Sequence, residues 1–416
     1  MAQPLRKNRD FIVLVAGRTI SQFGTAMTTF VIPWLFLQIT GSGTKTGIAF
    51  AIGFIPYIIV SLPAGVWADR FNRKMLMVVA DAGRLTLLLC IPLTHLITAA
   101  TPLSLLYAVQ AGVSLLSAIF DAAYGACVPQ IVAPAHLREA NNALQTGRSL
   151  SRIVGPVLGG VAIFWMGATN TIFIDVASYT ISIASMFAIT QSLSTPQEPD
   201  RKSFLQDLRL GLSPVWNIKP VRYLMVLATL TNLVGPGIDV ALLYRLQHEL
   251  RLGAQWAGII MTGLSGGMFV GSLVNKWVGK HIDVGRWLTI SAGLQVFPPI
   301  MLAFTQNGIV ICLLQVYTGI LLVAWNVQSV TLRQTLVPNH LLGRSSSVFR
   351  LSAWIFIPLG DAMAGMIGQA YGTRTYFIIA ASVLIIVSVL CMYVRLDRVL
   401  PSTVESVESV ESLPSS

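Results

Sequence analysis

The chain has 416 residues, of which 54% are hydrophobic and only 11% are charged. Soluble globular domains carry about 25% charged residues, so this composition excludes a soluble protein and indicates a chain that lies largely within a membrane. The formal net charge is +11, but the basic residues cluster between apolar segments, where they set topology and require no nucleic-acid partner. The four cysteines show no metal-binding spacing, so neither a metal site nor a disulfide framework is expected.

Twelve apolar runs are long enough to cross about 30 Å of hydrocarbon as α-helices. In chain order, the expected spans cover residues 10–37, 45–68, 75–98, 103–128, 139–166, 171–193, 221–247, 254–276, 286–305, 308–333, 345–370 and 374–395. With a cytoplasmic N-terminus, most lysines and arginines outside the spans fall on the cytoplasmic side. The positive-inside rule therefore predicts a multi-pass protein whose two termini are both cytoplasmic.

A short charged loop joins the second and third expected spans. Its motif residues are Gly65, Asp69, Arg70, Arg73 and Lys74. We expect Gly65 to allow a close helix approach and Asp69 to accept hydrogen bonds from the N-terminus of a neighbouring helix. Arg73 is expected to pair with Asp121 in the fourth span. Such a network would latch the cytoplasmic side shut, whereas the simpler alternative is a turn that only fixes topology.

A cluster of small residues interrupts the fifth expected span. It comprises Gly155, Pro156, Gly159 and Gly160. Proline removes a backbone donor and bends a helix, and glycines let a neighbouring helix pack closely against the bend. Taken alone, this pattern predicts a packing feature.

Five acidic residues fall within spans, where charge is expensive and by default suggests function. They are Asp81, Asp121, Asp175, Asp239 and Asp361. The first two lie near cytoplasmic ends, where pairing with Arg84 and Arg73 is the simpler explanation. Asp175 lies near the outer end of its span, within reach of interfacial water. Asp239 and Asp361 are nearest mid-depth and are candidate sites for protons or a cationic substrate, with a satisfied polar contact as the alternative.

Polar residues also follow one face of the first and of the tenth span. They are Arg18, Ser21, Gln22, Thr25, Thr28 and Thr29 in the first, and Gln315, Thr318, Trp325, Asn326 and Ser329 in the tenth. A polar stripe in lipid faces the bundle interior or a water-filled cavity, although any single Ser or Thr can instead bond to its own helix backbone. Arg152, at the start of the fifth span, either meets an anionic substrate or extends to the membrane surface.

A proline-rich polar segment divides six spans from six, and Pro134-Ala135-His136-Leu137 recurs as Pro338-Asn339-His340-Leu341. The sequence therefore predicts an N-terminal six-helix bundle over residues 1–193, a cytoplasmic central loop over 194–220 and a C-terminal bundle over 221–398. The tail, residues 399–416, repeats Val-Glu-Ser and lacks the apolar content to pack, which predicts disorder.

The G-x-x-x-D-R-x-x-R-K loop resembles the signature of the major facilitator superfamily, and G-P-x-x-G-G resembles the motif of its exporting, antiport branch. Residues 16–24 and 80–84 are similar to the subfamily of macrolide-efflux and enterobactin-exporter carriers. The resemblance implies an all-α membrane protein of twelve transmembrane helices in two pseudo-symmetric six-helix bundles, with helices one, four, seven and ten lining a cavity. Ala108 stands where many proton-coupled antiporters of the superfamily carry arginine, so coupling through that position is not expected.

The resemblance implies a secondary active transporter rather than an enzyme, and the sequence contains no nucleotide-binding loop through which ATP would drive it. We expect export of a hydrophobic or amphiphilic small molecule, such as a macrolide antibiotic, by alternating access in exchange for protons. The protein is expected to act as a monomer in the cytoplasmic (inner) membrane, without a cofactor. The alternatives are an exporter of a siderophore or other secreted metabolite, a lysolipid flippase, and a non-transporting sensor or scaffold.

Overall fold

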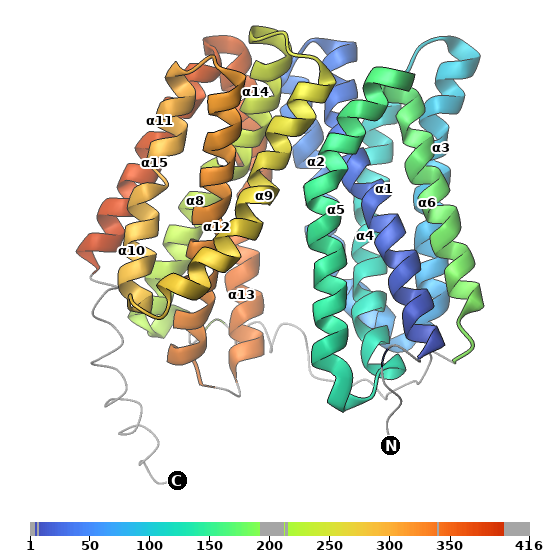
Figure 1. Cartoon of the computed structure of the whole chain (residues 1–416), viewed down its shortest axis with the longest axis horizontal. Coiled ribbons are helices and arrows are strands. Elements are labelled where there is room, and N and C mark those ends of the chain that lie inside the picture. The colour runs from blue at the N-terminus through green and yellow to red at the C-terminus, as the bar shows by residue number, and fades with distance from the viewer. Residues whose placement is uncertain (1–4, 6–7, 192–211, 213–214, 339–340, 395–416) are drawn as a thin grey trace. The chain divides into compact units, whose positions relative to one another are not determined.

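The structure is a computed structural model, and it describes residue 5 and residues 8–191, 212, 215–338 and 341–394 (Figure 1). All secondary structure in these residues is helical, and no strand occurs among them. Twelve helical segments of this part of the chain are long and apolar enough to cross a membrane. They coincide closely with the spans predicted from the sequence, so the all-α fold with twelve candidate transmembrane helices is confirmed.

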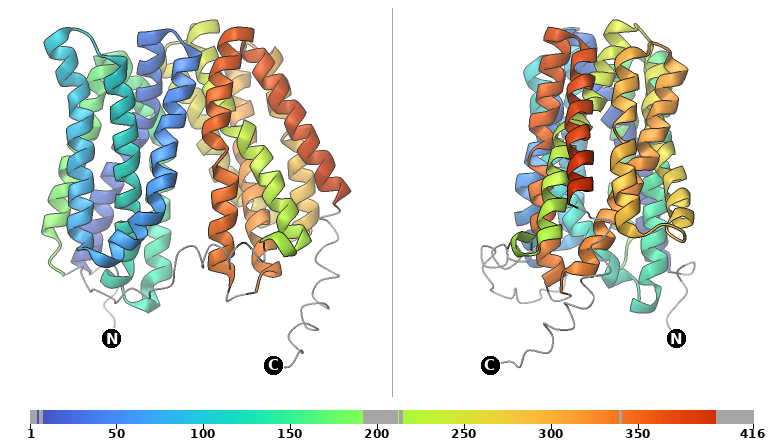
Figure 2. Two further views of the ribbon diagram at one scale, coloured as in Figure 1. Left: turned by 180° about the vertical axis from the view of Figure 1, so that it is seen from behind. Right: turned by 90° about the vertical axis from the view of Figure 1, so that its left-hand side faces the viewer.

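The first six spans are single helices. They are α1 (Arg9–Thr40), α2 (Gly43–Arg70), α3 (Arg73–Thr98), α4 (Leu103–Ile131), α5 (Leu137–Met166) and α6 (Ala168–Ala188). The later spans are α8 (Lys219–Tyr244) with the π-helical turn η3 (Arg245–Glu249), α9 (Ala254–Val278), α10 (Val284–Leu294) with α11 (Phe297–Phe304), α12 (Gly308–Leu336), α13 (Leu342–Trp354) with α14 (Ile357–Tyr371), and α15 (Thr373–Tyr393). Figure 2 shows the helices of each half standing side by side.

Two of the spans are divided into two helices, which the hydropathy pattern does not reveal. The break between α10 and α11 precedes Pro298 and Pro299, and the break between α13 and α14 precedes Pro358. Proline has no backbone N–H, and its ring excludes the carbonyl four residues earlier, so the hydrogen-bond ladder stops there.

Turn chemistry sets several helix ends. The side chain of Asn72 accepts a hydrogen bond from the backbone N–H of Met75 at the start of α3, at 3.1 Å. Gly167 between α5 and α6 and Gly372 between α14 and α15 have φ of 82° and 83°, values that favour glycine. The same special backbone conformation at corresponding turns agrees with the internal repeat seen in the sequence.

The chain separates into two compact units, each with its own apolar core. The first unit contains residues 1–200 and 242–262, and the second contains 201–241 and 263–416. Leu14, Met77, Phe120 and Met186 belong to the core of the first unit, so α1, α3, α4 and α6 converge there. The second core gathers side chains from α8, α10, α12, α13 and α15. The predicted bundle limits, 1–193 and 221–398, stay predictions; the tail and most of the central loop lie outside the described residues.

Candidate functional site

The hinge between α2 and α3 is held together by Arg73, the first residue of α3. Its Nε donates a hydrogen bond to the carbonyl of Ala68 and its Nη1 to the carbonyl of Ala126, both at 2.9 Å. Its Nη2 lies 3.3 Å from Oδ1 of Asp69. Ala68 belongs to α2 and Ala126 to α4, so one buried guanidinium joins the ends of three helices.

Three expectations for this hinge are wrong in detail. The ion-pair partner of Asp121 is Arg18 and not Arg73. Asp69 accepts its hydrogen bond from the Arg73 side chain rather than from a helix N-terminus. A Cβ on Gly65 would meet no described atom within 4 Å, so this glycine marks no close helix approach. The physical reason is that the Arg73 side chain folds back onto the end of α2, where Ala68 and Asp69 lie, and so does not extend to Asp121.

The other two basic residues of the hinge behave differently from each other. Nζ of Lys74 donates a hydrogen bond to the carbonyl of Ile189, directly after α6, at 2.8 Å. Arg70 is exposed at the end of α2. The hinge therefore fastens the start of α3 to the end of α6, and its action as a latch stays a proposal.

A charge cluster lies inside the first unit, and its more exposed ion pair is Arg18–Asp121. Nη2 of Arg18 on α1 lies 2.7 Å from Oδ1 of Asp121 on α4, and the hydroxyl of Tyr57 donates to Oδ2 at 3.2 Å. The guanidinium carbon of Arg18 lies 4.5 Å from the ring centroid of Phe120 and 5.2 Å from that of Tyr124. The sequence predicted a polar role for Arg18 but not this partner, which is 103 residues away.

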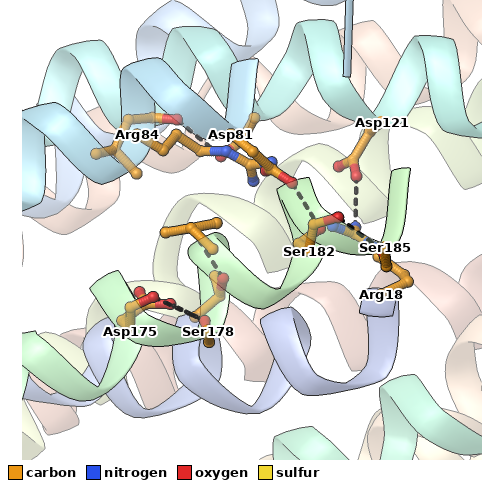
Figure 3. Close-up of polar contacts among 12 residues, drawn as sticks. Arg18, Asp81, Arg84, Asp121, Asp175, Ser178, Ser182 and Ser185 are labelled. Carbon is orange, nitrogen blue, oxygen red and sulfur yellow. Dashed lines mark hydrogen bonds and ion pairs between the residues drawn. The ribbon is translucent and has the colours of Figure 1, made fainter. Parts of the chain in front are cut away.

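The more deeply buried ion pair of the cluster is Asp81–Arg84, one turn apart on α3. Both side chains are buried, and Nη2 of Arg84 forms an ion pair with Oδ1 of Asp81. Oγ of Ser182 on α6 donates to Oδ2 of Asp81 at 2.6 Å. Arg84 also lies over the rings of Phe120 and Tyr179, at 4.5 and 4.7 Å. The predicted pairing of Asp81 with Arg84 is confirmed (Figure 3).

Asp175 completes the cluster, and here the sequence expectation is wrong. The residue is only 2% exposed, so it does not reach interfacial water. It lies on the inward face of α6, where Oγ of Ser178 donates to its Oδ1 at 2.9 Å. A position near a helix end says little about depth when the helix packs on two neighbours.

Some polar residues of α1 contact another helix, and others form hydrogen bonds within α1. The hydroxyls of Thr25 and Tyr179 are 3.0 Å apart, which joins α1 to α6. Ser21 and Thr28 are buried, whereas Gln22 is half-buried. The hydroxyl of Thr29 donates to the carbonyl of Thr25 within the same helix, as the simpler alternative expected.

The small residues of α5 pack against α1. A Cβ on Gly155 would lie 2.4 Å from Cβ of Ala26, and one on Gly159 would lie 3.3 Å from the carbonyl oxygen of Met27. Gly160 is buried as well, and Pro156 lies inside the helix. The predicted close packing at this motif is confirmed. Arg152, one turn earlier, is exposed.

An apolar groove of about 760 Å³ follows α1, α5 and α6 in the first unit. It is lined mainly by apolar side chains, among them Phe23, Leu158, Phe173 and Ile181, and also by Gly24 and Ser178. Volumes of this order accommodate drug-sized ligands. The groove lies directly over the helix face that carries Asp175.

The second unit holds two acids inside the bundle, of which Asp361 is buried and Asp239 is half-buried. Nε2 of Gln315 on α12 donates to Oδ1 of Asp239 on α8 at 3.4 Å. Asp361 on α14 is only 4% exposed, and its Oδ1 is buried without a hydrogen-bond partner. Neither acid forms an ion pair within the described ranges of the chain. The sequence singled out both residues by depth alone, and the structure places Asp239 and Asp361 near each other, with Gln315 and Tyr376 beside them.

Glycines bring the helices of these two acids together. A Cβ on Gly360 would lie 1.9 Å from the carbonyl oxygen of Leu233, and one on Gly237 would lie 2.8 Å from the carbonyl oxygen of Gly360. The Tyr376 hydroxyl donates to the carbonyl of Val234 at 3.0 Å beside this contact. The backbones of α8 and α14 therefore touch next to Asp239 and Asp361.

The polar stripe predicted on α12 is mostly structural. Trp325 is buried in the apolar core of the second unit, and Asn326 is exposed. The hydroxyl of Thr318 donates to the carbonyl of Leu314 in its own helix. Gln315 alone among these residues reaches a candidate acid, within the part of the chain that the structure describes.

Among the described residues, twelve helical segments that can cross a membrane, with buried acids and arginines between them, are the architecture of a membrane transporter. The sequence matches the family of transmembrane secretion effectors over residues 2–414, and the chain belongs to this family. It is similar to the multidrug efflux pump Tap of Mycobacterium tuberculosis, with 28% identity over 89% of this chain and 90% of the relative. It is also similar to macrolide efflux protein A of Streptococcus pyogenes, with 22% identity over 92% and 95%.

Solved structures share the fold. A bacterial homologue of the iron transporter ferroportin in an inward-facing state aligns with a TM-score of 0.77 and 16% identity, over 94% of this chain and 99% of that one. The nucleoside transporter NupG aligns with a TM-score of 0.74 and 13% identity, over 92% and 98%. The family and the relatives are transporters, so the chain is a multi-pass carrier of small molecules and not an enzyme.

Proposed function

We propose that the protein exports a hydrophobic or amphiphilic small molecule, of the type of a macrolide or another drug, in exchange for protons by alternating access. Efflux is supported by the relatives, whose names specify multidrug and macrolide efflux. It is also supported by the close packing of Gly155 on α1, within the motif that resembles that of antiporters. The apolar groove on α1, α5 and α6 suits the proposed substrate class.

The observation that carries proton coupling is the pair of acids in the second unit. Asp239 has Gln315 as its polar partner, and Asp361 has a buried oxygen that accepts no hydrogen bond from described residues. A buried carboxyl group without a cation is stable when it is protonated, and it releases its proton when water or a cation reaches it. These acids are therefore our candidates for the coupling site.

The test is drug accumulation in a pump-deficient bacterial host that expresses the chain, with macrolides, tetracyclines, quinolones, cationic dyes and catecholate siderophores. We expect lowered accumulation of one drug class, restored by a proton uncoupler. Asp239→Asn and Asp361→Asn should abolish gradient-driven efflux but retain downhill exchange. The matched control is Asp283→Asn, because Asp283 is exposed and forms a long ion pair with Arg286.

Each other outcome has a definite meaning. If both acid variants pump like the wild type, these acids do not couple transport to protons. If catecholate siderophores alone respond, the substrate is a secreted metabolite, and a changed lipid composition without any drug response identifies a lipid flippase. If the chain reaches the membrane and no transport changes, the sensor or scaffold alternative holds.

We also propose an inner-membrane monomer whose termini are both cytoplasmic, on the basis of the basic residues between the spans. A reporter fused to the C-terminus that is active only in the cytoplasm tests the orientation. A reporter that is active only outside the membrane would reverse it.

A further inference from the structure

Figure 3 shows two arginines, Arg18 and Arg84, and three acids, Asp81, Asp121 and Asp175, in the charge cluster of the first unit. Arg152 on α5 adds a third cation, and it faces Asp121. Arg18 is paired with Asp121, and Arg84 is paired with Asp81. Asp175, the acid of α6, forms no ion pair with any residue that the structure describes.

The surroundings of the Asp175 carboxyl group are closed and sparingly polar. Its Oδ1 accepts a hydrogen bond from Ser178 at 2.9 Å, and the hydroxyl of Thr28 lies beside the group. Its Oδ2 is buried and accepts no hydrogen bond from the described residues. On the α1 side, Gly24 leaves room for the carboxyl group, because a Cβ there would lie 2.5 Å from Oδ1.

The neighbouring groove does not open onto this carboxyl group. Gly24 and Ser178, which contact Asp175, belong to the lining of the groove, but Asp175 itself does not, and the lining is almost entirely apolar. An ionised carboxylate with one unpartnered oxygen in such a place is strongly unfavourable, whereas the neutral acid is tolerated.

We propose that Asp175 is a proton-binding site of the first unit, separate from the acids of the second unit, and that it carries its proton in this conformation. The groups that face it are Arg84 and Asp81 from α3, Tyr179 from its own helix, and, further along the cluster, Arg18 from α1 and Asp121 from α4. When Asp175 loses its proton, Arg84 is the nearest cation that can compensate the new charge. Arg84 on α3 is then shared between Asp81 on its own helix and Asp175 on α6. The protonation of Asp175 therefore controls whether Arg84 links α3 to α6.

The opposite end of the cluster shows where the proton can enter. The side chain of Asp121 is 31% exposed, whereas those of Asp81 and Arg84 are 0% and 2% exposed. A proton from water therefore meets Asp121 first, and a shift of Arg18 away from Asp121 opens the way toward the interior pair. The site takes a proton and no larger ligand, because the buried carboxyl group is covered by Ser178 and α1.

Infrared spectroscopy of the purified full-length protein at neutral pH, without substrate or gradient, tests the proposal. We expect Asp175→Asn to remove one carboxylic-acid C=O band from the wild-type spectrum, while the melting temperature stays close to that of the wild type, because asparagine has the shape of the neutral acid. Asp81→Asn is the matched control. It should remove no such band, and it should lower the melting temperature because it leaves Arg84 without its carboxylate.

An unchanged acid band in Asp175→Asn, or the same loss in Asp81→Asn, would overturn the proposal. If Asp175→Asn does not fold, Asp175→Glu provides the second measurement, since it keeps the acid and should shift the band in frequency; no shift would count against the site. The infrared measurement requires no transport. A failure of proton antiport at Asp239 and Asp361 would therefore leave the proposal for Asp175 unaffected.

Discussion

Arg18 on α1 and Asp121 on α4 form an ion pair of 2.7 Å beneath two aromatic rings. The pair closes the cluster toward its more exposed side, and Tyr57 on α2 supplies a third helix to the same contact. The pair therefore joins α1 to α4 through a direct charged contact, to which α2 contributes the Tyr57 hydroxyl.

This pair should show clear energetic coupling. In a double-mutant cycle with Arg18→Gln and Asp121→Asn, we expect a coupling energy of about 1–3 kcal/mol, because the two groups are in direct contact. The measurement is the free energy of unfolding in detergent for the four proteins. Additive effects of the two substitutions would show that the pair contributes nothing as a pair.

Arg84 should matter more to stability than any surface arginine. Arg84→Ala leaves the buried carboxylate of Asp81 unpaired, and breaking a buried pair in this way typically destabilises a protein by about 3–5 kcal/mol. The control is Arg286→Ala, whose pair with Asp283 is largely exposed and which should change stability by about 1 kcal/mol at most. Equal melting temperatures for the two variants would contradict the role assigned to Arg84.

The hinge residue Asp69 should affect turnover more than insertion. Asp69→Asn weakens the contact with Arg73, while Arg73 keeps its two carbonyl partners, so the helices still meet. We expect reduced efflux at wild-type expression and membrane level, measured as the initial rate of drug extrusion. Asp283→Asn is the control for loss of an exposed acid, and efflux by Asp69→Asn at the control rate would rule out the latch.

Gly155 should not tolerate even one additional carbon. A Cβ there would lie 2.4 Å from Cβ of Ala26, so Gly155→Ala must push α5 away from α1. Gly125 on α4 is the matched control, since no described atom lies within 4 Å of its Cβ position. There, alanine should be neutral or stabilising by up to about 1 kcal/mol through helix propensity. The melting temperatures of the two alanine variants are compared with that of the wild type. An unchanged melting temperature for Gly155→Ala would argue against tight packing at this position.

Hydropathy was sufficient for the spans, because each membrane helix must bury about 20 consecutive residues in hydrocarbon whatever it packs against. It also predicted Asp239 and Asp361 as candidates from their distance to the span ends; Asp361 is buried and Asp239 half-buried, and their role stays a proposal. Hydropathy could not predict which side chains of different helices contact each other. Arg18 and Asp121 are separated by 103 residues, and no periodicity within a helix specifies which neighbour a side chain meets.

Local motifs predicted where the hinge lies along the chain, but they did not predict which atoms its side chains contact. The hinge was located correctly, yet Arg73 took the nearby carbonyls of Ala68 and Ala126 in place of a distant acid. Asp175 was assigned to the interface because it lies early in α6, and its burial depends on how α1 covers that helix. In both cases the answer lay in a neighbouring helix that the local sequence does not describe.

The contact of Gly237 and Gly360 leaves no space between α8 and α14 for a file of water molecules. Any side chain at either glycine would force the two backbones apart. A movement of α8 against α14 must therefore begin beside Asp361, whose Oδ1 is buried and accepts no hydrogen bond from the described residues. Such a movement changes the surroundings of this acid and with them its readiness to hold a proton.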